Sequence, residues 1–221
     1  MNQEAGWTAS YFRSLPSVIA VVSFPDAKLA AEAAMALMDG GIRAIELALR
    51  NDAALDAIRK IEKQVPGMII GAGTVLREDQ IPAVIDAGAS FAVAPGFNPR
   101  VVETALLKKL PFAPGIATPS EIEIALSLGI SVMKVFPAKY LGGLEYMKSM
   151  AAPFDHLGIG FIPLGGLAAE DLTPYLKEKI IVSVGGSWIA QKKDIEERNW
   201  NRIREKAEEA VHLVKQIGGR I

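Results

Sequence analysis

The chain has 221 residues, of which 50% are hydrophobic and 22% are charged, and its formal net charge is −1. A chain of this length can bury a sizeable core, and single α/β barrels often have this size. The near-zero net charge gives no reason to expect nucleic acid or an anionic membrane as a partner. The absence of cysteine excludes disulfides, thiolate metal ligands and a cysteine nucleophile.

Three features of the sequence predict a cytoplasmic protein. The first residues lack the basic segment and the long apolar segment of a secretory signal peptide. No apolar run approaches the roughly 20 residues that a membrane-spanning helix needs. The lack of cysteine also fits a reducing compartment.

Eight short apolar runs alternate along the chain with amphipathic segments. Each run has the length of a strand, and its near-continuous hydrophobicity is typical of parallel strands that are covered on both faces. The spacing between runs, roughly 20 to 30 residues, is that of a βα unit. The runs begin at Ser17, Ala44, Met68, Phe91, Pro111, Ser131, Phe161 and Ile180.

This repetition predicts a (β/α)8 TIM barrel over residues 17–188, within a single domain of residues 1–221. Residues 1–16 are expected to form a helix that caps one end of the barrel, and residues 194–217 a long C-terminal helix. The alternative is an open doubly wound sheet, which also alternates strands and helices. The repeat along this chain does not reverse or break, and this favours the barrel.

One helix start is predicted from a capping pattern. Ser120 is followed three residues later by Glu123, a spacing at which each side chain can bond to the backbone N–H of the other residue. Gly129 then marks the end of the segment. We therefore expect a helix that starts at Ser120.

Lys134 interrupts the sixth run, VMKVF, at a position where an apolar residue is expected. Burying an unpaired ammonium is costly, and burial favours the neutral amine. A neutral lysine amine can attack a carbonyl carbon and form a Schiff base. A structural interpretation is also open, in which the side chain reaches solvent or pairs with a buried carboxylate for packing alone.

Glu46 repeats this pattern in the second run, AIELAL, and Arg50 follows four residues later. Beside Lys134, Glu46 could act as a general acid and base, or it could form a salt bridge that only holds the barrel together. Alternation along a strand places Arg50 on the same side as Glu46 and nearer the mouth of the barrel. Its planar guanidinium suits a carboxylate, although an exposed loop arginine would also fit this position.

Glycine pairs follow the last two runs, at Gly165-Gly166 and at Gly185-Gly186. In parallel barrels the active residues lie at the carboxyl ends of strands, and these two loops frequently bind phosphate through backbone N–H groups. Ser187 adds a hydroxyl donor. One Gly-Gly pair commonly marks an ordinary turn, whereas two pairs in these two loops favour an anion site.

The other candidate residues give weaker signals. Pro95 and Phe136 would form apolar walls beside the lysine, although such residues are more often part of the core. His156 and His212 are the only histidines, and neither lies at a strand end or near acids at ligand spacing. We therefore predict no metal and no cofactor.

Taken in order, the strand ends resemble the 2-keto-3-deoxy-6-phosphogluconate (KDPG) and 4-hydroxy-2-oxoglutarate (KHG) aldolase family. The matching segments are IELALR, GAGTV, APG, PGIATPSE, KVFPA, GG and GGSW, and they run from about Ser17 to Trp188. No single segment is decisive, but the ordered combination is specific. The resemblance implies a class I aldolase that needs no metal, and a homotrimer.

The resemblance also implies a role for each strand-end residue. Lys134 would form the imine with the keto acid, and Glu46 would be the acid/base residue. Arg50 and Thr74 would bind the pyruvate carboxylate, Pro95 and Phe136 would line that pocket, and Gly165, Gly166, Gly186 and Ser187 would hold the substrate phosphate. The implied reaction is cleavage of KDPG to pyruvate and glyceraldehyde 3-phosphate, with cleavage of KHG to pyruvate and glyoxylate as a second activity.

Leu164 departs from the family pattern, which usually has threonine directly before the Gly-Gly of the seventh strand. Loss of that hydroxyl removes a hydrogen bond near the polar chain of the substrate, and such bonds can discriminate strongly between substrates. The galactonate epimer of KDPG and a related keto acid without phosphate therefore remain open as substrates.

Two other functions fit parts of the pattern. A sugar-phosphate isomerase or epimerase would keep the phosphate loops and use Glu46 as a base, although paired acids or histidines would then be expected at several strand ends. A non-catalytic anion-binding barrel would use Lys134 and Glu46 only as a structural pair.

Overall fold

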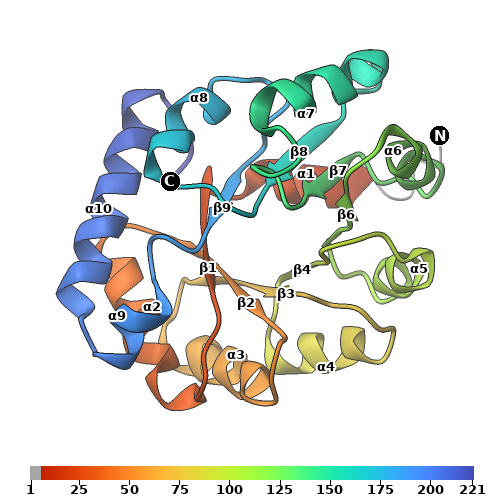
Figure 1. The fold of residues 1–221 in the computed structure, drawn as a ribbon. Coiled ribbons are helices and arrows are strands. Elements are labelled where there is room, and N and C mark those ends of the chain that lie inside the picture. The colour runs from red at the N-terminus through yellow and green to blue at the C-terminus, as the bar shows by residue number, and fades with distance from the viewer. Residues whose placement is uncertain (1–5) are drawn as a thin grey trace.

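The computed structural model describes residues 6–221, and it consists of curled parallel sheets surrounded by helices (Figure 1). One sheet has six strands in the order β5-β4-β3-β2-β1-β9, and the other has three in the order β6-β7-β8. The strands are β1 (Val18–Val22), β2 (Ala44–Ala48), β3 (Ile69–Gly73), β4 (Phe91–Val93), β5 (Phe112–Ala113), β6 (Gly115–Ile116), β7 (Val132–Val135), β8 (Gly160–Pro163) and β9 (Val184–Gly186).

Strands β1 to β5 are neighbours in the sheet in the same order as in the sequence, and every pair is parallel. A doubly wound sheet reverses its strand order, so this alternative is excluded. The predicted parallel α/β class is confirmed. The strand pairing differs from a single ring of eight strands, because it is divided into sheets of six and three.

The two sheets are separated at two places. Pro114 has no N–H to donate to a neighbouring strand, and it separates β5 from β6 within the fifth apolar run. On the other side, the chain before β9 meets β8 through one isolated bridge, Phe161–Ile181. At the first place, the Lys134 N–H donates to the Pro114 carbonyl (2.9 Å) and the Gly115 N–H donates to the Gly96 carbonyl (3.1 Å). At the second place, the Phe161 N–H donates to the Ile180 carbonyl (2.6 Å) and the Val182 N–H donates to the Phe161 carbonyl (2.8 Å).

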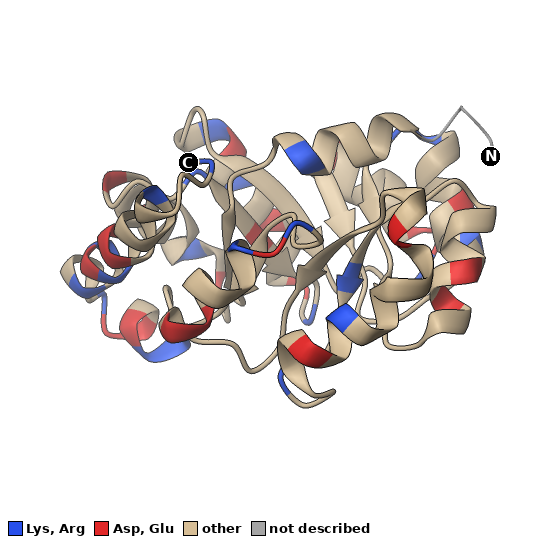
Figure 2. Ribbon diagram, turned by 90° about the horizontal axis from the view of Figure 1, so that it is seen from above, with Lys and Arg blue, Asp and Glu red and all other residues tan. Residues whose placement is uncertain are grey.

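The helices form the outer layer, in which α10, α2, α3, α4 and α5 follow one another around the sheet (Figure 1). Lys, Arg, Asp and Glu residues are interspersed along the helices (Figure 2). None of the helices between residues 6 and 221 is long and apolar enough to cross a membrane. The helices are α1 (Gly6–Ser14), α2 (Ala30–Asp39), α3 (Ala53–Gln64), α4 (Gln80–Ala87), α5 (Pro99–Leu107), α6 (Pro119–Ser127), α7 (Gly143–Ala151), α8 (Leu172–Leu176), α9 (Lys192–Glu196) and α10 (Trp200–Gln216), with short 3-10 segments η2 (Ala27–Leu29), η3 (Ala152–Leu157) and η4 (Ala169–Asp171).

The capping box of α6 lies two residues before the predicted one. Thr118 is the N-cap, its hydroxyl oxygen accepts the Glu121 N–H, and Glu121 in turn accepts the Thr118 N–H. Pro119 occupies the first helical position, where the missing N–H has no intrahelical partner to lose. The prediction based on Ser120 was wrong because the same spacing occurs twice, and the proline favours the earlier start.

Alternate residues of each strand point to opposite sides of the sheets. One side packs against the outer helices, and the other encloses what we call the interior cluster. Because Glu46 lies two residues after Ala44, and Lys134 two residues after Val132, both charged side chains point toward this interior. The interior cluster consists of Phe12, Leu15, Ile19, Ala44, Phe91, Val93, Ala113, Val132, Ile162, Leu164 and Val182.

Helix α1 packs against the interior cluster. The ring of its Phe12 lies edge-on to Phe91, with ring centroids 5.8 Å apart, and Leu15 just beyond the helix is also buried. The helix predicted over residues 1–16 is observed from Gly6 to Ser14. The part of the prediction that concerns residues 1–5 lies outside the described residues.

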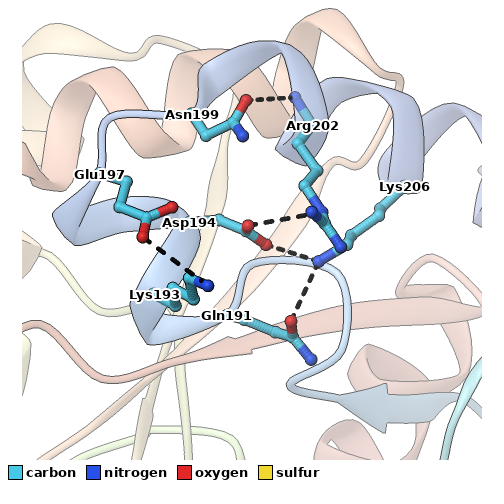
Figure 3. A network of polar contacts seen from close by, with 7 residues as sticks. All are labelled: Gln191, Lys193, Asp194, Glu197, Asn199, Arg202 and Lys206. Carbon is cyan, nitrogen blue, oxygen red and sulfur yellow. Dashed lines mark hydrogen bonds and ion pairs between the residues drawn. The ribbon is translucent and has the colours of Figure 1, made fainter.

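The single C-terminal helix predicted over residues 194–217 is instead two helices, α9 and α10. Arg198 adopts a φ of 52° between them, which ends the helical geometry. Asp194 of α9 is buried, and its carboxylate pairs with the ammonium of Lys206 in α10 at 2.5 Å (Figure 3). A buried carboxylate needs such a partner, so this ion pair holds the short helix against the long one.

Candidate active site

Lys134 of β7 and Glu46 of β2 meet in the interior that the two sheets enclose. The Lys134 Nζ donates a hydrogen bond to the Glu46 Oε1 at 3.0 Å, and the two side chains are only 5% and 4% exposed. The ammonium also lies 5.5 Å from the centroid of the Phe136 ring. The alternative in which Lys134 extends to solvent is therefore excluded. The ion pair places a proton donor and a proton acceptor in contact across 88 residues of sequence.

The neighbouring strand makes room for the Glu46 carboxylate. A Cβ atom on Gly73 of β3 would lie 2.1 Å from the Glu46 Oε1 and 2.8 Å from its Cδ, which is too close for any side chain. The sheet register brings these strands together, with Glu46 opposite Gly71 and Ala48 opposite Gly73. A side chain at position 73 would therefore displace the Glu46 carboxylate from its observed position.

A pocket of about 230 Å³ opens from this ion pair toward the carboxyl ends of the strands. Every residue that the sequence predicted for the site contributes to its wall. These residues are Glu46, Arg50, Thr74, Pro95, Lys134, Phe136, Gly165, Gly166, Gly186 and Ser187. Glu46 is the one carboxylate among the described lining residues, so the paired acids expected of an isomerase do not occur there.

The pocket wall also contains residues that sequence reasoning did not select. They are Val21, Val22, Ser23, Ala48 and Leu167, together with Leu164, which was noted only as a departure from the family pattern. Gly185, the first residue of the second predicted glycine pair, also lines the pocket. Ser23 carries a hydroxyl directly after β1. It could have been predicted from the sequence, because a polar residue stands there at the carboxyl end of the first apolar run.

Arg50 and Thr74 stand on one side of the pocket mouth. Strand β2 ends at Ala48, so Arg50 lies beyond the strand rather than within it, and its side chain is exposed. No ion pair within residues 6–221 involves its guanidinium, which leaves the fork available to a ligand. Thr74 follows β3 with a φ of 59°, a backbone conformation that is unusual for a β-branched residue and recurs at functional sites.

The glycine-rich loops stand on another side of the pocket. Gly165 and Gly166 have φ values of 97° and 81°, which glycine adopts without strain. No residue from 6 to 221 forms a hydrogen bond with Gly166 or Ser187, so their N–H groups and the Ser187 hydroxyl are available to a ligand. Leu164 is buried beneath this loop and packs against Gly185.

Among residues 6–221, no group of three or more His, Cys, Asp or Glu side chains lies close enough together to hold a metal ion. The polar groups that line the pocket are instead one lysine, one arginine, one carboxylate, hydroxyls and backbone N–H groups. Such a set can form a covalent imine and bind anionic groups on either side of it.

Residues 10–206 match the family model of KDPG and KHG aldolase. The chain belongs to the KDPG and KHG aldolase family. The KHG/KDPG aldolase of Escherichia coli K12 is 37% identical over 198 residues, which cover 90% of this chain and 92% of that protein. The predicted family is thus confirmed, and with it the enzyme class, an aldolase among the carbon–carbon lyases.

Solved structures of the KDPG aldolase family superpose on this fold. The KDPG aldolase of Legionella pneumophila, with pyruvate captured as a covalent carbinolamine intermediate, has a TM-score of 0.84 and 32% identity, and the match covers 89% of this chain and 95% of that one. The KDPG aldolase of Zymomonas mobilis with 3-phosphoglycerate has a TM-score of 0.83 and 36% identity, with 91% and 93% covered.

Proposed function

We propose that this chain is a Schiff-base aldolase that cleaves KDPG to pyruvate and glyceraldehyde 3-phosphate, and KHG to pyruvate and glyoxylate. The observation that carries the proposal is the buried contact between Lys134 and Glu46 at the base of a pocket with anion-binding groups above it. The covalent carbinolamine of pyruvate in the Legionella pneumophila relative is the chemistry that a lysine in this position would perform.

The pyruvate half of the substrate is proposed to bind beside Lys134. Its carboxylate accepts hydrogen bonds from the free guanidinium of Arg50 and from Thr74, and Pro95 and Phe136 provide the apolar walls. This orientation presents the C2 carbonyl to the Lys134 Nζ. Transfer of a proton from Lys134 to Glu46 across their 3.0 Å hydrogen bond generates the neutral amine that attacks.

Cleavage then proceeds through the imine. The amine adds to C2 to form a carbinolamine, which loses water with a proton supplied by Glu46 to form the protonated imine. Glu46 accepts the C4 hydroxyl proton, directly or through water, the C3–C4 bond breaks, and its electron pair moves into the imine. The products are an aldehyde and the enamine of pyruvate. Protonation at C3 and hydrolysis release pyruvate and regenerate the Lys134 amine.

The aldehyde half is proposed to extend toward the glycine-rich loops. The N–H groups of Gly165, Gly166 and Gly186 and the hydroxyl of Ser187 would hold its phosphate. The buried Leu164 is part of the pocket wall beside Gly185, and its side chain offers no hydrogen bond to the substrate hydroxyls. The galactonate epimer of KDPG is therefore a second candidate substrate.

Three further properties are part of the proposal. The hydrogen bonds at Pro114 and Phe161 favour a closed (β/α)8 barrel in which the two sheets act as one ring, within a single domain of residues 1–221. The family resemblance favours a homotrimer, which light scattering on the purified protein can test. The lack of cysteine favours a cytoplasmic location.

Imine trapping tests the proposal directly. The purified protein is incubated with pyruvate and borohydride, and its intact mass and peptide masses are measured. We expect one added pyruvate unit per chain on Lys134, and no adduct in Lys134→Ala. An adduct that persists in Lys134→Ala would contradict the assignment of the lysine.

Turnover separates the aldolase from the two other functions. A substrate panel of KDPG, its galactonate epimer and KHG, read out as pyruvate release, should identify the preferred aldehyde. Isomerisation of a sugar phosphate without imine trapping would favour the isomerase. A Lys134→Met/Glu46→Gln protein that binds phosphorylated ligands, together with a wild type that turns nothing over, would favour the anion-binding barrel.

A further inference from the structure

The loop that follows the lysine strand lies directly on the glycine-rich loop. The Ala138 N–H donates to the Leu164 carbonyl at 2.7 Å, and the Lys139 N–H donates to the Gly165 carbonyl at 3.1 Å. The aliphatic stem of Lys139 then crosses Gly166, where a Cβ atom would lie 2.9 Å from its Cβ and 3.5 Å from its Cδ. The ammonium is two bonds beyond Cδ, so it can reach a ligand that is bound at Gly166.

The glycine-rich side of the pocket has no positive charge of its own. The two cations among the described lining residues are Lys134, which is paired with Glu46, and Arg50. A phosphate monoester carries a charge of about −2 near neutral pH. Backbone N–H groups and the Ser187 hydroxyl can bond to its oxygens, but they do not neutralise it. A nearby ammonium would complete this side of the site.

Lys139 is only weakly held by its present partner. Its Nζ lies 3.6 Å from the Asp171 Oδ2, which is beyond hydrogen-bond distance, and the Lys139 side chain is 50% exposed. That same Asp171 oxygen already accepts the Ala168 N–H at 2.9 Å. Ion pairs with this exposure contribute little to stability, so exchanging the carboxylate for a phosphate costs little.

We propose that Lys139 is a further specificity-determining residue, whose ammonium leaves Asp171 and pairs with the terminal phosphate of the substrate held at Gly166. This inference rests on the proposed function, because it assumes that the phosphate occupies the glycine-rich side of the pocket. It adds a cation to that side, and it makes Asp171 a competitor for that cation. The enzyme therefore prefers phosphorylated keto acids over those without phosphate.

Two substitutions test this role in opposite directions. Lys139→Met keeps the stem over Gly166 and removes the charge, so we expect KM for KDPG to rise about tenfold, as for one lost charge-assisted hydrogen bond. KM for KHG should rise by much less, and kcat for KDPG should change by less than about twofold.

Asp171→Asn keeps an oxygen for the Ala168 N–H but frees Lys139, so KM for KDPG should fall. Lys177→Met controls for net charge, because Lys177 is the exposed C-cap residue of α8 and has no ion pair within residues 6–221.

Binding of 3-phosphoglycerate, measured by calorimetry, keeps this test independent of turnover. Lys139→Met should weaken binding about tenfold and reduce its dependence on salt, whereas Lys177→Met should leave both unchanged. A Lys139→Met protein with wild-type affinity, or one with equal losses toward KDPG and KHG, overturns the proposal. A wild type that traps no pyruvate but loses affinity in Lys139→Met would instead contradict the aldolase function and leave Lys139 as an anion-binding residue.

Discussion

The carboxylate of Glu46 occupies the space that a side chain at Gly73 would need. A Cβ atom on Gly73 would lie 2.1 Å from the Glu46 Oε1, the same oxygen that accepts the hydrogen bond from Lys134 at 3.0 Å. Glu46 is thus held between the backbone of β3 and the ammonium on β7. The geometry of the proposed acid/base pair depends on a residue that has no functional group.

Gly73→Ala tests this dependence. The added methyl group should displace the Glu46 carboxylate from Lys134, and we expect kcat for KDPG cleavage to fall at least about 100-fold, the lower end of what general acid–base catalysis contributes. Gly96→Ala is the matched control, because a Cβ atom there meets nothing within 4 Å. Steady-state kinetics with thermal melting would check both variants. Wild-type kcat in a folded Gly73→Ala protein would contradict the role of Glu46.

The ion pair between Lys134 and Glu46 should also affect the free energy of unfolding. Lys134→Met leaves the buried Glu46 carboxylate without its partner, and we expect the free energy of unfolding to fall by about 3 kcal/mol. Adding Glu46→Gln removes the uncompensated charge and should restore most of this loss. Urea unfolding of the wild type, the two single variants and the double variant gives the coupling. Additive losses would show that water in the pocket replaces Lys134 as a partner.

Leu164→Thr should change the choice of substrate. A threonine hydroxyl on this wall can bond to the hydroxyls of the aldehyde half, so kcat/KM for KDPG should rise up to about tenfold relative to that for KHG. Leu164→Val removes the same bulk without adding a hydroxyl and serves as the control. Pyruvate release from both substrates is the measurement. If Leu164→Val gives the same change, the pocket volume rather than the hydroxyl sets the preference.

Backbone strain at Lys109 predicts a stabilising substitution. Lys109 follows α5 with a φ of 57°, which costs a side-chain-bearing residue about 1 kcal/mol, and its own side chain is exposed. Lys109→Gly should therefore raise the free energy of unfolding by up to about 1 kcal/mol. The neighbouring Lys108 has a φ of −85°, so Lys108→Gly should lower it instead. Urea denaturation would show whether the two variants change the free energy of unfolding in opposite directions.

Much of the fold followed from patterns within single segments. Each apolar run predicted a parallel strand because residues with both faces buried are apolar throughout. The interruptions at Lys134 and Glu46 indicated functional side chains because such groups are not buried without a reason. The boundaries were less certain. The capping box formed at Thr118 rather than Ser120 because Pro119 favours the earlier start. The C-terminal helix divided at Arg198, where a φ of 52° ends the helical geometry that the apolar pattern alone would continue.

The sequence by itself determined the family, the parallel α/β class and which side chains share one face of a strand, since side-chain direction alternates along a strand whatever the strand packs against. Only the tertiary structure decided what those side chains meet. The contact of Lys134 with Glu46, the space for Glu46 at Gly73 and the position of Lys139 over Gly166 join residues far apart in sequence. Such contacts depend on the register and curvature of the sheets, which no single segment encodes.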